Sequence, residues 1–434
     1  MRRTIGWLIT IFLILKVSSV CAEEAKSSET NSSKHWQQKF GLEERLRYEY
    51  KQDFDFNESL RDNGSLFFHR LKLSSQTSLL DDGKKNILDI FVEGLDAQTG
   101  SYQTKANAGQ VDDFDVHQAY IHLHRLMGAG VDFKLGRQEI VYGAGRLIAQ
   151  PAWSNRMRHF DAAVAHFYTP EMYADLLYAQ DVKYDDNNFN RSLDEEYLTG
   201  IYSGYQKDKK SFLLEGYFLT QGVTTTDAPV KRYTVGSRWQ GKLPAEILCD
   251  VEIPFQFGHS GKKDIRAFAL HADLAREFSS WFLKPKWTLE LNQASGDKDP
   301  NDSVVNTFNP LYQSTHTPYG DLDFFRWQNM REVAVNVNLA VTQKLKLRPQ
   351  TNFFWLDSKS DAWVNSSGTT LRSQTSGERG YYVGQELSLK ANYEVNKNIK
   401  LESGYAHFFT GGYIHDTGAD DDADWLYTQV AVKY

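Results

Sequence analysis

Residues 333–341 read Val-Ala-Val-Asn-Val-Asn-Leu-Ala-Val, so every second side chain is a large aliphatic one and the residues between are Ala or Asn. Successive side chains of a β-strand point to opposite faces, and a period of two therefore predicts a strand with one apolar and one polar face. The same alternation occurs in residues 245–257, 283–292 and 426–434. These segments predict a sheet that separates an apolar medium from water.

When the alternation is followed outward from these segments, it gives about 18 strands, most of them near the ~9–11 residues that a tilted strand needs to cross a bilayer. We therefore expect an all-β fold, a transmembrane antiparallel β-barrel of about 18 strands. The expected strands lie near residues 39–51, 66–80, 86–97, 114–126, 130–141, 159–168, 172–183, 195–206, 210–221, 231–241, 244–257, 264–275, 281–293, 331–342, 344–356, 381–394, 398–409 and 424–434.

The connections between these strands alternate in length. Those that follow even-numbered strands are short, such as residues 81–85 and 169–171, whereas most of the others are long, such as residues 142–158, 294–330 and 357–380. Outer-membrane barrels have short periplasmic turns and longer extracellular loops. The even strand count then places both termini of the barrel on the periplasmic side.

The amino-acid composition agrees with a membrane barrel and argues against a nucleic-acid-binding protein, and the absence of a repeat argues against a soluble repeat protein. Aromatic residues make up 14% of the 434 residues and charged residues 24%, which suits a wall that is apolar outside and wet inside. The formal charge of −7 gives no basic excess, so no nucleic-acid partner is expected. A soluble propeller or solenoid would show a repeat of fixed period, and no such repeat is found.

The first residues have the features of a secretory signal. Arg2 and Arg3 precede an apolar run, and a small-residue exit ends at Ala22. We expect residues 1–22 to be a signal peptide, residues 23–38 to be a flexible periplasmic leader, and residues 39–434 to be the barrel. Cleavage removes three basic residues and no acidic one, so the mature chain is more negative than the full chain.

The last expected strand ends on the aromatic residue Tyr434. An aromatic end on an alternating strand resembles the signal that outer-membrane barrels present to their insertion machinery, although it also suits a girdle tyrosine at the membrane boundary. The expected surroundings are therefore the lipid and lipopolysaccharide of a Gram-negative outer membrane, with the insertion machinery as a partner. The oligomeric state is left open.

One stretch carries a family resemblance. Residues 136–148 read Gly-Arg-Gln-Glu-Ile-Val-Tyr-Gly-Ala-Gly-Arg-Leu-Ile and are followed by Trp153 and Asn155. Together with residues 307–320 and 411–427, they resemble the motifs of the alginate export family. The resemblance implies an 18-stranded outer-membrane channel. Some members of that family export an anionic polysaccharide, and many similar sequences are porin-like channels.

Arginine is the expected selectivity residue, because its planar guanidinium pairs with carboxylates in bidentate fashion and keeps its charge. Four arginines lie close together in and near the loop at residues 142–158, and other basic residues, such as Arg45, Arg47 and Lys390, fall on the polar faces of strands. We expect the loop to fold inward as a constriction. The candidate pore-lining residues are Arg137, Arg146, Arg156, Arg158, Arg70, Arg348, Tyr142 and Trp153.

The alternative for the loop at residues 142–158 is an ordinary outer loop whose arginines contact lipopolysaccharide phosphates.

Two groups of residues suggest a metal site, but in each the sequence favours another interpretation. Asp297, Asp299 and Asp302 form an acidic run that suits calcium, but the run lacks the closing Glu of a calcium loop, which favours a solvated loop. His122 and His124 share a strand face, but no matching carboxylate pattern accompanies them in the sequence, which favours polar lumen residues.

The function expected from these features is passive diffusion or export of anionic or sugar-like solutes, including an acidic polysaccharide such as alginate. Such a channel needs no cofactor and no catalytic residue. Two alternatives from other classes remain: a barrel enzyme of the lipase or protease type, and an adhesin or assembly scaffold with a closed lumen. No nucleophile motif such as Gly-x-Ser-x-Gly supports the enzyme.

Overall fold

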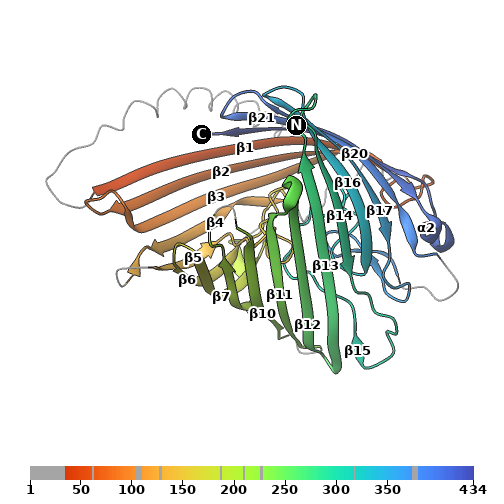
Figure 1. The fold of residues 1–434 in the computed structure, drawn as a ribbon, viewed down its shortest axis with the longest axis horizontal. Helices are drawn as coiled ribbons and strands as arrows, with labels where there is room; N and C mark the ends of the chain where they lie inside the picture. Colours follow the sequence, from red (N-terminus) through yellow and green to blue (C-terminus); the bar gives the residue numbers. More distant parts are fainter. Residues whose placement is uncertain are drawn as a thin grey trace.

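The computed structural model describes residues 35–434 except 61–62, 103–109, 127–129, 186–187, 209–210, 225–227, 317 and 374–379. The expected signal peptide and most of the expected leader lie outside the described residues. Eighteen long strands form one closed antiparallel barrel (Figure 1), which confirms the expected fold class. These strands are β1 His35–Gln52, β2 Gly64–Leu80, β3 Asn86–Tyr102, β4 Asp112–Leu123, β5 Val131–Gln138, β6 Phe160–Tyr168, β7 Met172–Lys183, β9 Glu196–Tyr205, β10 Leu213–Val223, β11 Val230–Lys242, β12 Leu248–Ser260, β13 Lys263–Glu277, β14 Lys286–Ala294, β16 Met330–Ala340, β17 Leu345–Trp355, β20 Tyr382–Glu394, β21 Ile399–Thr410 and β22 Ala423–Lys433.

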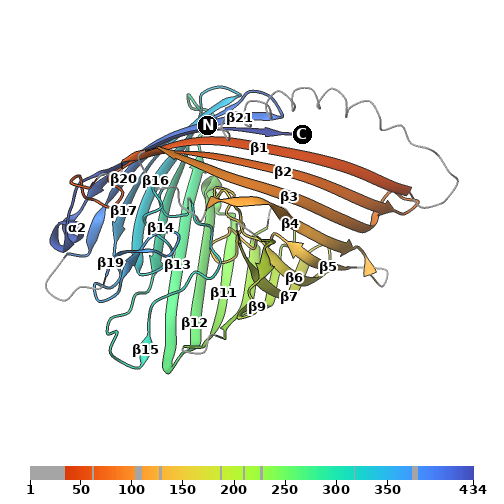
Figure 2. The same cartoon turned by 180° about the vertical axis from the view of Figure 1, so that it is seen from behind.

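The first and last strands close the barrel. β1 pairs antiparallel with β22, in a register that runs from Glu43 opposite Lys433 to Gln52 opposite Asp424. Figure 2 shows the C-terminal end of the chain beside the long β1 strand, seen from behind. Because lipid offers no hydrogen-bond partner to an open edge, this pairing makes the wall compatible with a membrane.

The two faces of the wall differ in the way that the alternation predicts. In β14, Leu289 and Leu291 are each 45% exposed and lie on the outer face, whereas Asn292 is buried on the inner face. In β1, Arg45 and Arg47 point inward and are buried. The outer wall is therefore apolar, and charged side chains gather inside.

The connections at the end of the barrel where the C-terminus lies are short turns. Short turns mark the periplasmic end of an outer-membrane barrel. The longest connections lie at the other end and comprise residues 139–159, 295–329 and 356–381. No helix in the described part of the chain has the length and apolarity that a membrane-spanning helix needs. The short elements are β8 Arg191–Ser192, β15 Val304–Val305, β18 Trp363–Val364, β19 Thr370–Arg372, the 3-10 helix η3 Pro244–Glu246 and α2 Gly412–Thr417.

Three strands begin four or five residues away from the expected start, and β3 ends at Tyr102 rather than 97. β1 begins at His35 rather than 39, so residues 35–38 of the expected leader belong to a strand. β12 begins at Leu248 rather than 244, because η3 occupies the segment before it. β14 begins at Lys286 rather than 281, because Leu283 and Lys284 adopt positive φ angles of 62° and 44° in a turn. Alternation alone does not reveal such turns.

The extracellular half of the barrel contains a packed apolar core. Phe325 of the 295–329 loop stacks on Phe354 of β17, with ring centroids 4.0 Å apart. Phe324 of the same loop packs against Phe408 of β21 and Trp363 of β18. The long loops thus fold back into the barrel, and their side chains form a core there rather than a free surface.

Candidate functional site inside the barrel

Two long loops meet inside the barrel. Ile148 of the 139–159 loop and Tyr312 of the 295–329 loop form a β-bridge. The Ala149 N–H donates to the Tyr312 carbonyl over 2.9 Å, and the Tyr312 N–H donates to the Leu147 carbonyl over 2.8 Å. Leu147, Ile148 and Tyr312 are all buried. The two loops therefore form one unit within the barrel.

One end of the 139–159 loop is anchored by Arg146. Its Nη1 donates to Glu252 over 3.0 Å, and Nη2 lies 3.5 Å from Asp250 and contacts His271. Tyr217 donates to the other oxygen of Glu252 over 3.0 Å. The Arg146 side chain is almost fully buried, and its charge is compensated by two carboxylates on β12. Arg146 therefore holds the loop against the wall.

The loop bends sharply before this anchor. Gly143 and Gly145 have φ angles of 56° and 73°, in the left-handed region where glycine has no steric penalty. A Cβ at Gly143 would lie 2.8 Å from the Tyr202 hydroxyl. The glycines that the sequence places beside Arg146 are thus required by the turn.

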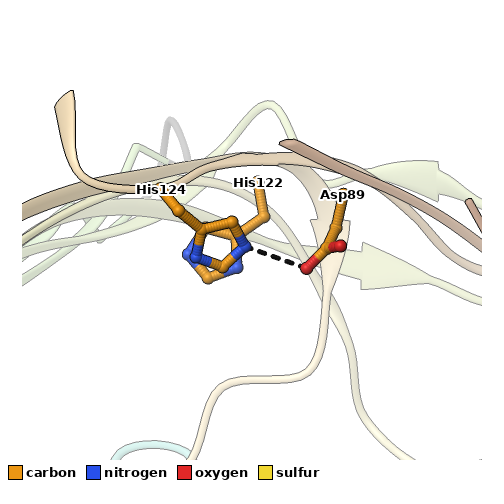
Figure 3. Close-up of side chains that lie close together, drawn as sticks. All are labelled: Asp89, His122 and His124. Atoms are coloured by element: carbon orange, nitrogen blue, oxygen red, sulfur yellow. Dashed lines mark hydrogen bonds and ion pairs between the residues drawn. The ribbon is translucent and has the colours of Figure 1, made fainter. Parts of the chain in front are cut away.

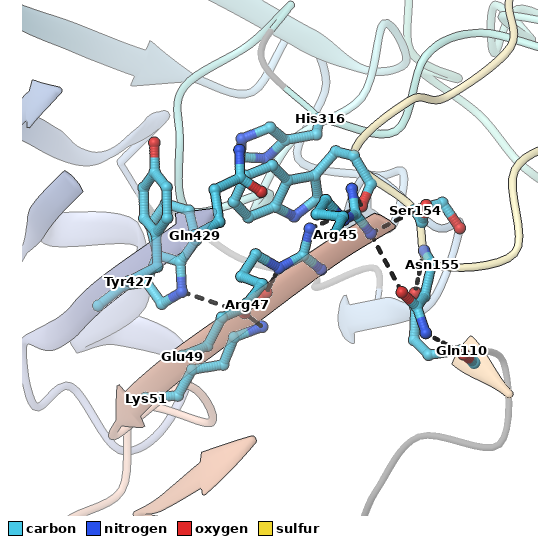
Figure 4. Close-up of polar contacts among 12 residues, drawn as sticks. Arg45, Arg47, Glu49, Lys51, Gln110, Ser154, Asn155, His316, Tyr427 and Gln429 are labelled. Atoms are coloured by element: carbon cyan, nitrogen blue, oxygen red, sulfur yellow. Dashed lines mark hydrogen bonds and ion pairs between the residues drawn. The ribbon is translucent and has the colours of Figure 1, made fainter. Parts of the chain in front are cut away.

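The other end of the loop is held by three arginines from β1 and β2. Arg45 donates to the carbonyls of Ala152 and Trp153 over 2.9 and 3.0 Å, and Arg70 donates to Ala152 over 2.9 Å. Arg47 donates to the Trp153 carbonyl over 2.7 Å and lies over the Trp153 ring, 3.8 Å from its centroid. Figure 4 shows Arg45 reaching from β1 toward Ser154 and Asn155, with Arg47 and Glu49 farther along the same strand. Since β12 anchors the opposite end, the loop crosses the interior.

Below this crossing lies a cavity of about 630 Å³. Trp153 and Gln150 of the loop line it together with residues of β1, β16, β17, β20, β21 and β22. Five of the lining side chains are cationic and only two are carboxylates, so the cavity is electropositive. The cationic residues are Arg45, Lys346, Arg348, Lys390 and Lys400, and the acids are Glu394 and Glu402.

Only part of this positive charge is compensated by ion pairs. Arg348 and Lys390 pair with Asp321 of the 295–329 loop, at 3.0 and 2.7 Å. Although burial raises it, Lys390 and Arg348 hold the pKa of Asp321 well below its ordinary value, so that this carboxylate is ionised. Within the described part of the chain, Arg45 and Lys400 have no ion pair. A net positive charge therefore remains in the cavity.

A second group of arginines consists of Arg158 and Arg326 of the two long loops and Arg232 of β11. Burial and the positive charges of Arg158 and Arg232 lower the pKa of Arg326 to about 10, so that Arg326 is still charged at neutral pH. None of these three arginines forms an ion pair with any described residue. Arg158 instead donates to the carbonyl of Gln313 over 3.1 Å, and Arg232 contacts the amide oxygen of Gln221. The interior thus holds two groups of incompletely compensated cations.

The expected pore-lining residues occupy different places. Trp153 and Arg348 line the cavity, and Arg70 lies beside the loop above it. Arg156 stacks on Tyr184, 4.2 Å from the ring centroid, and Tyr142 stacks on a wall tyrosine in the interior.

Arg137 corrects the expectation, because it does not face the interior. Arg137 lies two positions after Leu135, which is 52% exposed on the outer face, and side chains two positions apart in a strand share a face. There it forms a bidentate pair with Asp161, at 2.8 and 3.0 Å. The strand register, rather than the motif, decides this placement.

Several cationic residues of the cavity were not among the pore-lining candidates. Arg45 and Lys390 are found by the parity of their strands, and the same parity would have found Lys346 and Lys400 on β17 and β21. Asp321 gives no such signal, because it lies in a long loop whose path the sequence does not show.

The acidic run considered for calcium has a structural role in its loop. Asp297, Asp299 and Asp302 accept backbone N–H donors from residues two positions ahead, at 3.3, 3.0 and 2.7 Å. None of them belongs to the clusters of potential ligands among the described residues. Asp299 and Asp302 are exposed, as the solvated-loop interpretation expects, whereas Asp297 is buried.

Comparisons with known proteins agree with the barrel fold. The sequence model of the alginate export family matches residues 36–426. Among solved structures, Pseudomonas aeruginosa OpdO has a TM-score of 0.59 at 10% identity, with 92% of this chain and 97% of that chain covered. OccK2 (OpdF) from the same organism, solved in complex with glucuronate, has a TM-score of 0.60 at 10% identity and coverages of 91% and 97%.

The outer-membrane protein OpdK of Pseudomonas aeruginosa has a TM-score of 0.60 at 10% identity, with coverages of 91% and 99%. At these identities the three structures establish the likeness of fold alone. No curated protein matches the chain.

The Arg146 anchor can be tested by a double-mutant cycle with Arg146→Ala and Glu252→Gln. Arg146→Ala leaves the buried Glu252 without its cation, and we expect a loss of about 3–5 kcal/mol in the free energy of unfolding. Glu252→Gln leaves Arg146 with Asp250, so the loss for this change should be smaller. The coupling should be about 1–3 kcal/mol. Urea unfolding in lipid vesicles measures both quantities.

The exposed pair Arg266 and Asp264, 3.5 Å apart, provides the control, with an expected coupling below about 0.5 kcal/mol. Additive effects of Arg146→Ala and Glu252→Gln would contradict the anchor.

Proposed function

The chain belongs to the alginate export family, and on this basis we propose that it is a passive outer-membrane channel whose interior binds and conducts acidic sugars and related small carboxylates. The electropositive cavity below the 139–159 loop is the observation that carries the proposal. Solutes would move down their concentration gradients, and the channel would need no cofactor.

The chemistry of the cavity supports carboxylate recognition. Guanidinium and ammonium groups both form charge-assisted hydrogen bonds with carboxylates, and guanidinium does so in a fixed bidentate geometry. Lys346 and Lys400 lack ion pairs with described residues, so their charges are available to a solute. A cavity of about 630 Å³ accommodates a monosaccharide with its hydration water. OccK2, a structure of similar fold, was solved with glucuronate, which is a sugar carboxylate of this class.

The 139–159 loop is proposed as the constriction of the channel. It crosses from β12 to β1, and Trp153 borders the cavity while it stacks on His316, with ring centroids 4.1 Å apart. Burial and the nearby charge of Lys390 lower the pKa of His316, which therefore stays neutral at pH 7. The aromatic pair would provide a flat wall for a sugar ring, and the arginines would supply the charge.

A scaffold with a closed lumen is the second candidate. The aromatic core in the extracellular half, which includes Phe354 and Trp363, is the observation that favours it, because these side chains fill part of the interior. An enzyme is not among the candidates, because the family and the similar structures are channel proteins. Any measurable conductance through the purified protein separates the channel from the closed scaffold.

Charge removal in the cavity tests the proposed selectivity. The double variant Lys346→Gln/Lys400→Gln removes two cavity charges without breaking an ion pair, and it should lower the permeability ratio of chloride to potassium several-fold. The reversal potential in a potassium chloride gradient across a planar bilayer measures this ratio.

The matched control is Lys207→Gln/Lys397→Gln, which removes the same charge from the turns at residues 206–212 and 395–398. An equal shift in both double variants, or no shift in either, would refute the selectivity role of the cavity.

Replacement of residues 144–156 by a short Gly-Ser linker tests the constriction. If this segment narrows the channel, single-channel conductance should rise, because the barrel wall itself stays intact. The same linker in place of the exposed residues 298–303 is the control and should leave conductance near the wild-type value. Unchanged conductance after the first replacement, in protein that retains its barrel mobility on gels, would exclude the constriction.

A further inference from the structure

The inner wall of the barrel carries a cluster of two histidines and two aspartates that the channel function does not use. We infer that Asp89, His122 and His124 bind one divalent transition-metal ion of the zinc and copper type, with Asp132 orienting a ligand. The site lies beside the periplasmic turns, away from the electropositive cavity. It is independent of the proposed solute class.

The strand register brings these residues together. Asp89 of β3 stands opposite His122 of β4, and His124 follows directly after β4. One ligand atom from each of the three side chains lies within 4.8 Å of the other two. Figure 3 shows the two imidazole rings overlapping and the Asp89 carboxylate directed at them. The ring centroids of His122 and His124 are 3.8 Å apart.

The arrangement around His124 is the one that metal-binding histidines show. Its Nε2 lies 2.9 Å from Asp89 Oδ2, and its Nδ1 lies 3.4 Å from Asp132 Oδ2. A histidine that binds a metal through one nitrogen usually donates its other N–H to a carboxylate, which fixes the ring orientation and the tautomer. Asp132 is placed for that role, and Nε2 then faces the metal position together with Asp89.

Asp89 is itself held in place. Its Oδ1 accepts from the Ser78 hydroxyl over 2.5 Å, and the amide of Asn86 donates to both carboxylate oxygens, at 3.2 and 3.1 Å. A carboxylate oriented by such donors can present Oδ2 to an ion without rearrangement of the strand. The site is therefore supported by the wall around it.

The donor set decides the class of ion. Two imidazoles with one carboxylate suit zinc, copper or nickel, whereas calcium and magnesium prefer an all-oxygen shell. Two neutral imidazoles and the carboxylates of Asp89 and Asp132 carry a charge of −2, which a divalent cation neutralises. Three protein ligands leave a fourth position open to water. The side chains of His122 and His124 are 28% and 17% exposed, so an ion can reach them.

The other two clusters of potential ligands among the described residues are less suitable. In the group of Asp250, His271 and Asp273, the guanidinium of Arg146 already supplies the positive charge, 3.5 Å from Asp250. The group of Glu93, His117 and Glu139 offers a single imidazole beside two carboxylates, a donor set that suits zinc or copper less well than two imidazoles do. The cluster at Asp89 is thus the best metal site of the three.

The test uses the purified chain without a histidine tag, in detergent, after treatment with EDTA and removal of the chelator. Calorimetric titration with zinc chloride should show one bound equivalent per barrel. His122→Gln and His124→Gln should each weaken binding at least tenfold, and Asp132→Asn should weaken it by about 10- to 100-fold through the loss of the orienting carboxylate. His117→Gln is the matched control and should bind zinc as the wild type does.

Copper provides a second readout that does not depend on channel activity. Electron paramagnetic resonance of the Cu²⁺ form should show coupling to two imidazole nitrogens in the wild type and to one in His122→Gln. Equal zinc stoichiometry and affinity in the wild type and in the variant that combines His122→Gln with His124→Gln would overturn the site, and so would an absence of zinc binding. Loss of binding in His117→Gln alone would place the ion at the other cluster and would also overturn it.

Discussion

A strand in the hydrocarbon core of a membrane finds no water for its N–H and C=O groups, so each group must pair with a neighbouring strand. The pairing of β1 with β22 satisfies this constraint for the first and last strands, and with it for the whole wall. A closed wall has an outside that meets lipid and an inside that does not. The alternation of apolar and polar residues along each strand follows from this separation.

Closure also determines where charge can reside. The charged side chains of the strands are directed to the interior, and the loops that fold inward meet them there. The two ends of the 139–159 loop are held by different interactions. Arg146 is neutralised by the carboxylates of β12. At the other end, Arg47 pairs with Glu49 at 2.7 Å and Arg70 with Glu43 at 2.9 Å, whereas Arg45 donates to backbone carbonyls and to the Asn155 amide oxygen. Carbonyls and amides accept hydrogen bonds without cancelling charge, so Arg45, together with Lys346 and Lys400, which have no ion pair with a described residue, keeps the cavity electropositive.

The sequence was sufficient to predict the strands of the barrel wall, but it was not sufficient to predict which side chains meet in the interior. A period of two is a local property, and it identified all eighteen barrel strands from segments such as residues 333–341. It failed by a few residues where local turns intervene, as at η3 and at Leu283, because a turn with positive φ leaves no mark on the alternation.

The interior depends on register and on loop paths, which are not local. Arg137 belongs to the motif that suggested a constriction, yet its parity turns it outward to Asp161. Asp89 and His122 are 33 positions apart in the numbering, and only the pairing of β3 with β4 places them opposite each other. The partners of Arg348 and Lys390 came from a distant loop. Composition and spacing indicated the residue types of the interior but not which of them meet.

A positively charged interior should pass acidic sugars in preference to neutral ones. The most direct measurement compares the fluxes of glucuronate and glucose through the purified protein in the same proteoliposomes, at equal concentration and with the membrane potential clamped at zero. The two solutes are nearly equal in size and differ in charge. Glucuronate should have the faster flux, and the difference between the two fluxes should narrow as ionic strength screens the charges of the cavity. Equal fluxes at low salt, or a faster flux of glucose, would contradict this preference for acidic sugars.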